Sequence, residues 1–295
     1  MPPGEASEAR SGIVSGVLRE GDVERVTLMV LESYQAAGLI RKFSDMLDVD
    51  EAAVWSELMA SFSAGYRDAV SHGLSHVHFE RSAAALVPIS VLTCVPFFDW
   101  LEGSGISAEL STLNIPAIQP LHPGGGPRHR MGWYFRTRAV LMLEGLRRVA
   151  SVVGADEHAA LAQSVYFAAG ATGQRHQRGG MGRTGFEKVI DMAKAHGSRL
   201  GWGFTINPEA MFMNGRLANG GCRIVGSADL AELAEGGAGE GATLLREAHP
   251  RDVISAIERP DGSKWPVWVV LFDFYDATQS AFPRCPTGDL LRGKL

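Results

Sequence analysis

Four cationic side chains occur within nine residues of a glycine-rich segment. They are Arg175, His176, Arg178 and Arg183. Residues 170–186 contain no acidic side chain, and five glycines lie between Gly170 and Gly182 inclusive. Glycine allows the backbone to take positive φ angles and to approach a ligand closely. Guanidinium groups bind carboxylate, phosphate or sulfate through paired hydrogen bonds. The segment therefore predicts an anion site, with Arg175, Arg178 and Arg183 as substrate-binding residues.

The end of this segment favours the same interpretation. Residues 184–187 read Thr-Gly-Phe-Glu, the spacing of a capping box, which predicts that a helix begins there. The amino end of a helix attracts anions. The alternative is a solvated basic loop packed against acids elsewhere, and Glu187 in the first turn competes with a ligand. The pattern lacks the Gly-x-x-x-x-Gly-Lys-Ser/Thr of a nucleoside triphosphate loop.

A second basic segment runs from His122 to Arg138 and adds Arg128 and Arg130 as substrate-binding candidates. If this loop covers the same cleft, two cationic loops face one substrate. The alternative is a surface loop followed by a helix with arginines along its edge.

Two aspartates lie between aromatic residues. Asp99 lies between Phe98 and Trp100, and Asp273 between Phe272 and Phe274. An apolar setting raises the pKa of a carboxyl group, which then transfers protons near neutral pH. We therefore take Asp273, Asp99 and His176 as candidate catalytic residues. The alternative for each aspartate is a hydrogen bond to backbone at the end of an element.

The one local histidine cluster suggests a different chemistry. It consists of His72, His76, His78 and Glu80. On a strand, alternate residues project from one face, as metal ligands do in some oxygenases. No run of strands that could form a barrel surrounds the cluster, and His72 ends a predicted helix, where a histidine is favourable for the helix dipole alone. We assign no metal site and identify no cofactor from the sequence.

Composition limits the classes of function. The 295 residues are 45% hydrophobic and carry a net charge of −5, which argues against non-specific nucleic-acid binding. The three cysteines are far apart and the amino terminus lacks a signal-peptide pattern. The longest apolar run, residues 83–98, is too short to span a membrane and contains two prolines. We expect a soluble cytoplasmic protein with neither nucleic-acid nor membrane partners.

The spacing of apolar residues places these groups on a mainly helical chain. Helices are predicted over residues 22–38, 50–73, 133–153, 156–169 and 186–197. Residues 76–80 form either a strand or the entry to a helix, and residues 82–103 a buried, kinked segment. Short strands are predicted at residues 203–206, 211–213, 222–225 and 265–275, with a helix over residues 227–235.

The expected fold class is α+β. We expect a disordered tail over residues 1–12, a mainly helical region over residues 13–199, and a region with a small antiparallel sheet over residues 200–295. The last two regions are expected to pack as one globular unit.

The leading hypothesis is an enzyme acting on a small anionic metabolite, held by the basic loops while an aspartate or His176 transfers protons. Lyase, transferase and cyclase chemistry all remain open, as does a homo-oligomer. The second hypothesis is a metal-dependent oxidoreductase that uses the histidine cluster. The third is a non-catalytic binding or assembly protein, in which residues 83–100 form an interface.

Overall fold

The computed structural model describes residues 12–82, 85–104, 125–152, 161–205, 223–229 and 268–274. The chain divides into two compact units, which are described separately below. The first unit comprises Met1–Val95 and Phe167–Ala195, and the second comprises Pro96–Tyr166 and His196–Leu295.

The first unit is built on neighbouring strands in the order β1-β2-β3-β4. Their bounds are β1 (Ile13–Val17), β2 (His76–Arg81), β3 (Leu86–Pro96) and β4 (Ser164–Thr172). β2 runs antiparallel to both β1 and β3, and Ser15 of β1 lies opposite His78 of β2. β4 belongs to this unit from Phe167 onwards.

The first unit also contains three described α-helices between β1 and β2. They are α2 (Val23–Ala36), α3 (Leu39–Leu47) and α4 (Glu51–His72). Asp50 caps α4 by accepting a hydrogen bond from the backbone N–H of Ala53 at 2.7 Å. Gly73 ends α4 in the left-handed conformation, with φ of 65°. The predicted helices over residues 22–38 and 50–73 are therefore confirmed.

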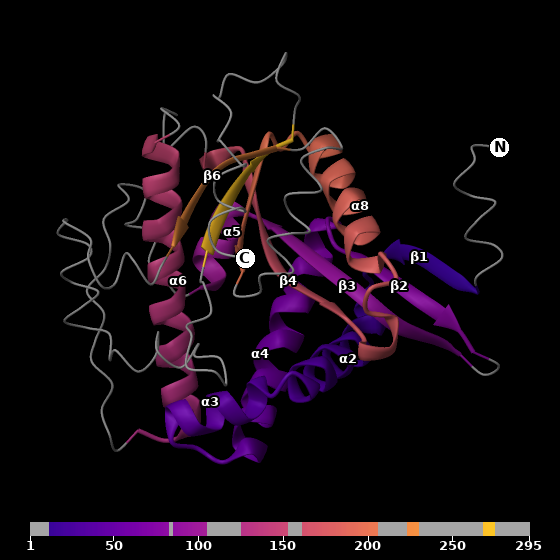
Figure 1. The fold of residues 1–295 in the computed structure, drawn as a ribbon, viewed down its shortest axis with the longest axis vertical. Helices are drawn as coiled ribbons and strands as arrows, with labels where there is room; N and C mark the ends of the chain where they lie inside the picture. Colours follow the sequence, from indigo (N-terminus) through magenta and orange to yellow (C-terminus); the bar gives the residue numbers. More distant parts are fainter. Residues whose placement is uncertain are drawn as a thin grey trace. The chain divides into compact units, whose positions relative to one another are not determined.

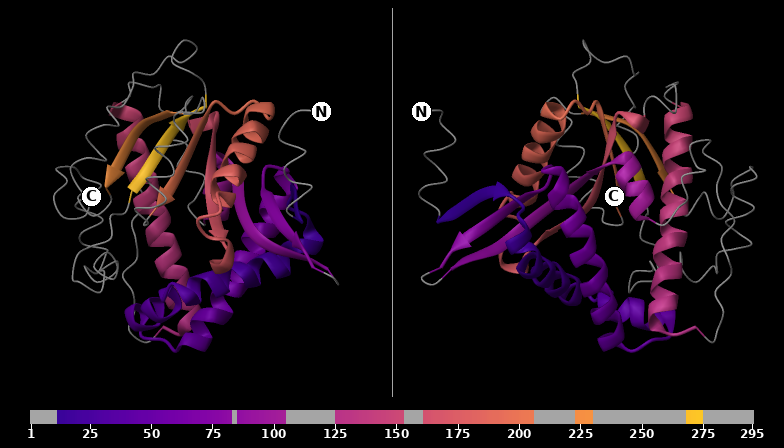
Figure 2. Two further views of the ribbon diagram at one scale, coloured as in Figure 1. Left: turned by 45° about the vertical axis from the view of Figure 1, so that its right-hand side comes forward. Right: turned by 180° about the vertical axis from the view of Figure 1, so that it is seen from behind.

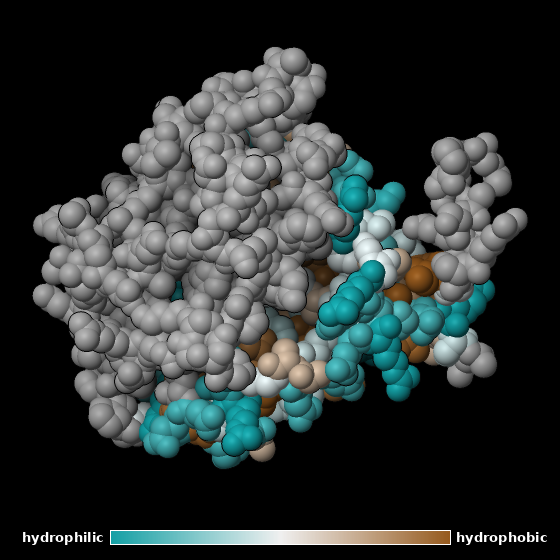
Figure 3. All heavy atoms as spheres, in the orientation of Figure 1, coloured by the Kyte–Doolittle hydropathy of each residue, from teal (hydrophilic) through white to brown (hydrophobic). Residues whose placement is uncertain are grey.

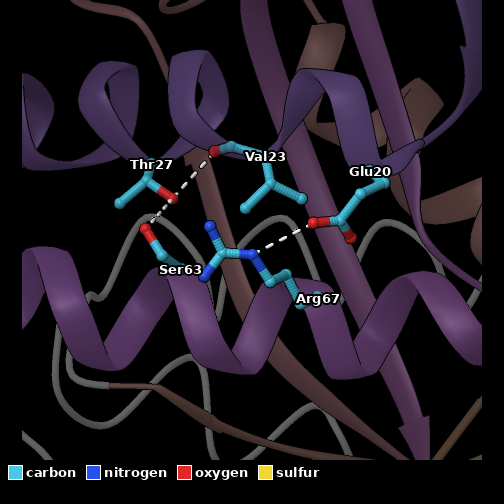
Figure 4. Close-up of polar contacts among 5 residues, drawn as sticks. All are labelled: Glu20, Val23, Thr27, Ser63 and Arg67. Carbon is cyan, nitrogen blue, oxygen red and sulfur yellow. Dashed lines mark hydrogen bonds and ion pairs between the residues drawn. The ribbon is translucent and has the colours of Figure 1, made fainter.

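Helices α2 and α4 pack on one face of this sheet. Val26 and Val30 of α2 and Tyr66 of α4 share a buried cluster with Val77 and Phe79 of β2. Between the two helices, the Ser63 hydroxyl donates to the Thr27 hydroxyl at 3.3 Å, and the Thr27 hydroxyl donates to the backbone of α2 (Figure 4). Because both hydroxyl groups are hydrogen-bonded, they are buried at a low desolvation cost.

Helix α8 (Met181–Ala195) packs on the opposite face of the sheet. His76 and His78 alternate with Val77 and Phe79 along β2, and their rings lie beneath Gly185 of α8. α8 crosses in front of β2 and β3, while α2 and α4 lie behind them (Figure 1, and Figure 2 from two other sides). The outward side of α8 carries hydrophilic residues in the space-filling view (Figure 3).

The second unit contains the antiparallel strands β5 (Leu200–Thr205), β7 (Trp268–Asp273) and β6 (Arg223–Asp229), in that order. Two helices belong to it, α5 (Phe97–Gly103) and α6 (Pro127–Val152), and α6 packs against β6 and β7. Its core contains a group of aromatic rings whose centroids are 4.5 to 6.3 Å apart. These are Phe97, Trp100, Tyr166 and Trp202.

The predicted fold class is wrong in its distribution of strands. We expected a helical region up to residue 199, but four of the seven described strands, β1 to β4, lie before residue 173. The cause is clearest in β3, where consecutive Ile89, Ser90 and Val91 are all buried. A strand covered on both faces lacks the alternation that identifies a strand, so its apolar run resembles a buried helical segment.

Three local boundaries also differ from the predictions. β4 occupies the later part of the helix predicted over residues 156–169, from Ser164 onwards, because consecutive Val165, Tyr166 and Phe167 are all buried. α6 begins at Pro127 rather than at residue 133, and proline suits the first position of a helix. β6 continues to Asp229, where a helix from residue 227 was predicted. The predicted strand at residues 211–213 lies outside the described residues.

None of the helices in the described ranges has both the length and the apolar character that crossing a bilayer requires.

Candidate anion-binding site

The glycine-rich segment lies between the end of β4 and the start of α8, in the first unit. We call residues 173–183, which include the first three residues of α8, the anion loop. The N–H of Gly173 donates to the carbonyl of Ile89 at 2.8 Å, which fixes the start of the loop to β3. A short 3-10 turn, η3 (Gln174–His176), follows, and the Gln177 amide donates to the carbonyl of Thr172 at 3.4 Å. The loop is therefore attached to the sheet at its beginning.

The backbone of the anion loop takes positive φ angles at two positions before the helix. Arg178 has φ of 65° and Gly180 has φ of 82°. In the described part of the chain, no carbonyl or side chain accepts a hydrogen bond from the N–H groups of residues 180–183. These are the donors that a helix leaves unsatisfied at its amino end, and together with the helix dipole they favour a bound anion.

Helix α8 begins four residues earlier than the capping-box pattern predicts, since Thr184 as the N-cap would make Gly185 the first helical residue. It starts at Met181, and Thr184 lies inside it, with both its N–H and its hydroxyl directed to the carbonyl of Gly180. Glu187 consequently lies in the second turn, and the first turn contains no acid. The predicted competition between Glu187 and a ligand at the helix end is thus reduced by the position of the helix.

The cations of the anion loop fall into two groups. Arg183 donates from Nε to Oε1 of Glu187 at 2.8 Å, and His176 Nε2 lies 3.7 Å from Oε2 of Glu80 on β2. Arg175 and Arg178 are exposed and have no carboxylate partner among the described residues. Two guanidinium groups therefore remain available to an anion, whereas the third is held by a carboxylate of its own helix.

The histidine cluster does not come together as a set of ligands. His72 lies 4.0 Å from Asp68 on α4, and Glu80 faces His176 instead of the other histidines. His76 and His78 are buried, with their ring centroids 4.7 Å apart, and the Ser15 hydroxyl is 2.9 Å from Nδ1 of His78. Among the described residues, no three His, Cys, Asp or Glu side chains are grouped so as to hold a metal ion.

Burial has a clear electrostatic effect on this histidine pair. Desolvation by burial is the main cause that lowers the pKa of His76 to about 4, with smaller contributions from the neighbouring His78 and Lys188. His76 is 5% exposed, and its Nε2 has no hydrogen-bond partner in the described part of the chain. His76 is consequently uncharged near neutral pH, and α8 packs on its neutral ring.

The other predicted site residues belong to the second unit. Asp273 is fully buried on β7, with Leu200 and Arg223 as its register partners on the two neighbouring strands. Asp99 is half-buried in the first turn of α5. Arg128 and Arg130 lie in the first turn of α6, and Arg130 donates from Nε to the carbonyl of Gly125 at 2.8 Å. The predicted meeting of the two basic segments around one substrate stays a prediction.

Two features of the site were missed at the sequence level. The pairing of Glu80 with His176 joins residues far apart in the chain, and no local pattern indicates it. The positive φ of Arg178 is equally hidden, because a non-glycine residue in that conformation has no sequence signature.

Comparisons with known proteins add a distant likeness. No family model and no curated protein matches the chain. An apo mutant of agmatine N-acetyltransferase is 12% identical, with a TM-score of 0.45, and the match covers 88% of this chain and 98% of that one. Drosophila melanogaster polyamine N-acetyltransferase is 11% identical, with a TM-score of 0.47, covering 90% and 100%. Mosquito arylalkylamine N-acetyltransferase like 5b is 14% identical, with a TM-score of 0.45, covering 88% and 98%. Values this low assign neither a family nor a function.

Proposed function

We propose that the chain is an enzyme that binds a phosphate-bearing small molecule at the anion loop and transfers a group from it to a second substrate. The observation that supports this most directly is the row of N–H groups at residues 180–183, next to Arg175 and Arg178. Phosphate oxygens accept several hydrogen bonds at once, and charge-assisted bonds of this kind are the stronger ones.

In this proposal the phosphate is a handle and does not react. The anion loop contains no Asp, Glu, Ser, Thr, Tyr, Cys or Lys, so it offers an anion many donors but no common nucleophile. Binding energy from a non-reacting part of a substrate positions the reacting part elsewhere. Among the reaction classes open from the sequence, group transfer makes use of such a handle.

The reaction to test first is transfer of an acyl group to a primary amine, since acetyltransferases of amines are the solved structures named above. Acetyl coenzyme A is a suitable donor because it carries a diphosphate. In this reaction the amine nitrogen attacks the thioester carbonyl, the thiolate leaves, and the nitrogen loses a proton. His176 of the loop itself is the candidate for receiving that proton.

The experiment is a binding titration of the purified protein with inorganic diphosphate and with coenzyme A, followed by an amine acetylation assay. We expect both ligands to bind, and the Arg175→Ala and Arg178→Ala variants each to bind them about tenfold more weakly. Binding by neither ligand, or unchanged binding in both variants, overturns the proposal. Binding without acetylation retains the anion site and removes only the acyl-transfer assignment.

A further inference from the structure

The pairing of His176 with Glu80 places a negative charge beside a site that the loop has built for anions. Glu80 lies near the end of β2, where its backbone is opposite Ile13 of β1 and Val87 of β3. Its position is therefore set by the sheet and is independent of the loop. The carboxylate reaches within 3.7 Å of His176 Nε2, and the two side chains are 51% and 25% exposed respectively.

The two carboxylates that contact the loop differ in origin. Glu187 holds Arg183 from the next turn of the same helix, four residues away, as such pairs commonly do. Glu80 comes from a strand 96 residues earlier in the chain and contacts the loop near its beginning. Of these two carboxylates, Glu80 alone is attached to an element outside the loop and its helix.

We propose that Glu80 is a specificity-determining residue of the anion site: it lowers the affinity of the anion loop for highly charged ligands, and it does so by occupying His176. This inference rests on the proposed function. While the imidazole of His176 faces Glu80, it is unavailable as a donor to the ligand. A more highly charged ligand loses more from the missing donor, because the attraction between donor and ligand increases with the charge of the ligand.

The solvent exposure of Glu80 and His176 limits how much Glu80 can change the affinity for an anion. Interactions between solvent-exposed charges are screened and each changes an equilibrium constant by a small factor. Glu80→Gln keeps the size and the polarity of the side chain but removes its charge. We expect this variant to bind inorganic diphosphate two- to five-fold more tightly than the unaltered protein, with a smaller gain for inorganic phosphate.

The matched control is Glu32→Gln on α2. Glu32 is exposed, belongs to the same unit, and contacts no loop cation in the described residues. This variant loses the same charge and should bind diphosphate as the unaltered protein does. A double-mutant cycle with His176→Gln separates the two parts of the inference. If Glu80 acts through His176, the gain from Glu80→Gln disappears in the His176→Gln background.

Isothermal titration of these four variants with inorganic diphosphate decides the question. A gain confined to Glu80→Gln and lost with His176→Gln supports the inference. No gain, an equal gain from Glu32→Gln, or a gain that persists without His176 overturns it. Failure of the proposed function is recognised separately: the unaltered protein then shows no diphosphate binding, or Arg175→Ala and Arg178→Ala both bind it unchanged.

Discussion

Two arginine-rich segments of the chain have similar compositions and different backbones. Residues 125–138 contain Gly125, Gly126 and four arginines, and from Pro127 they form the start of the 26-residue helix α6. Residues 173–183 contain four glycines and three arginines, and they form a loop that takes positive φ angles at two positions before α8. In the first segment the arginines project from a regular helix. In the second segment, backbone N–H groups without an acceptor among the described residues and arginine side chains lie within the same eleven residues.

This difference is the reason that we propose the anion site in the second segment and not in the first. Along α6, the N–H groups beyond the first turn donate to carbonyls of the helix itself, so the later arginines act without the backbone. In the anion loop, Arg178 immediately precedes the glycine pair at the amino end of α8, beside N–H groups that have no acceptor in the described part of the chain. The following predictions test this contrast, beginning with the largest expected effect.

The first prediction concerns the buried residues on which the helix of each segment packs, and their effect on the pH dependence of stability. α8 lies on the buried, neutral His76, whereas no described contact of α6 involves a buried histidine. Because the pKa of His76 falls to about 4 in the folded state, the unfolded chain binds the proton first as the pH decreases. Stability should therefore decrease from pH 6.5 towards pH 4, by up to about 3 kcal/mol. Denaturant unfolding at several pH values, with His76→Gln for comparison, measures it.

His76→Gln removes this titration, so its stability should depend less on pH over the same interval. An acid profile identical to that of the unaltered protein would show that other groups control the loss.

The second prediction compares one arginine from each segment. Arg178→Ala in the anion loop should weaken diphosphate binding about tenfold, because a charge-assisted hydrogen bond contributes roughly 1.5–3 kcal/mol. Arg136→Ala on the exposed side of α6 should leave binding unchanged. Titration calorimetry measures both. Equal losses in the two variants would mean that the anion responds to overall charge and not to the loop.

The third prediction concerns the backbone. Gly180→Ala places a side chain at φ of 82°, which costs about 1–2 kcal/mol for an L-residue. We expect a corresponding loss of stability and about fivefold weaker diphosphate binding, because relief of the strain moves the N–H groups. Gly126→Ala is the control, since a Cβ there meets nothing within 4 Å and its φ is not positive. Melting curves and titrations of both variants test the contrast; similar behaviour of the two would contradict it.

The fourth prediction, with the smallest effect, separates the arginines within the loop. Arg183→Ala should change diphosphate binding less than twofold, because its guanidinium already donates to Glu187. Stability should change by less than about 0.5 kcal/mol, as is usual for an exposed pair within a helix. A loss as large as that of Arg178→Ala would show that Arg183 leaves Glu187 when the ligand binds.

An element could be predicted from the sequence when the residues that define it lie close together in the chain. Helix α4 was predictable because Asp50, the apolar stripe and Gly73 act within a few residues of one another. β3 was not, since its burial depends on other elements, among them α2, which lies about fifty residues before it in the chain and shares its buried cluster with Val91. The loop was predictable as a glycine-rich, cationic segment, whereas the start of α8 was misplaced because Thr184 and Glu187 also fit a capping box.

The sequence by itself determined which residues could bind an anion: the arginines, the glycines that permit positive φ, and the absence of acids across residues 170–186. The tertiary structure decided where these residues lie and which partners they have. It placed Gly180 directly before α8, held Arg183 to Glu187, and brought Glu80 from β2 to His176. The physical reason is that composition and helical spacing act locally, whereas charge pairing between a strand and a loop depends on a sheet assembled from distant parts of the chain.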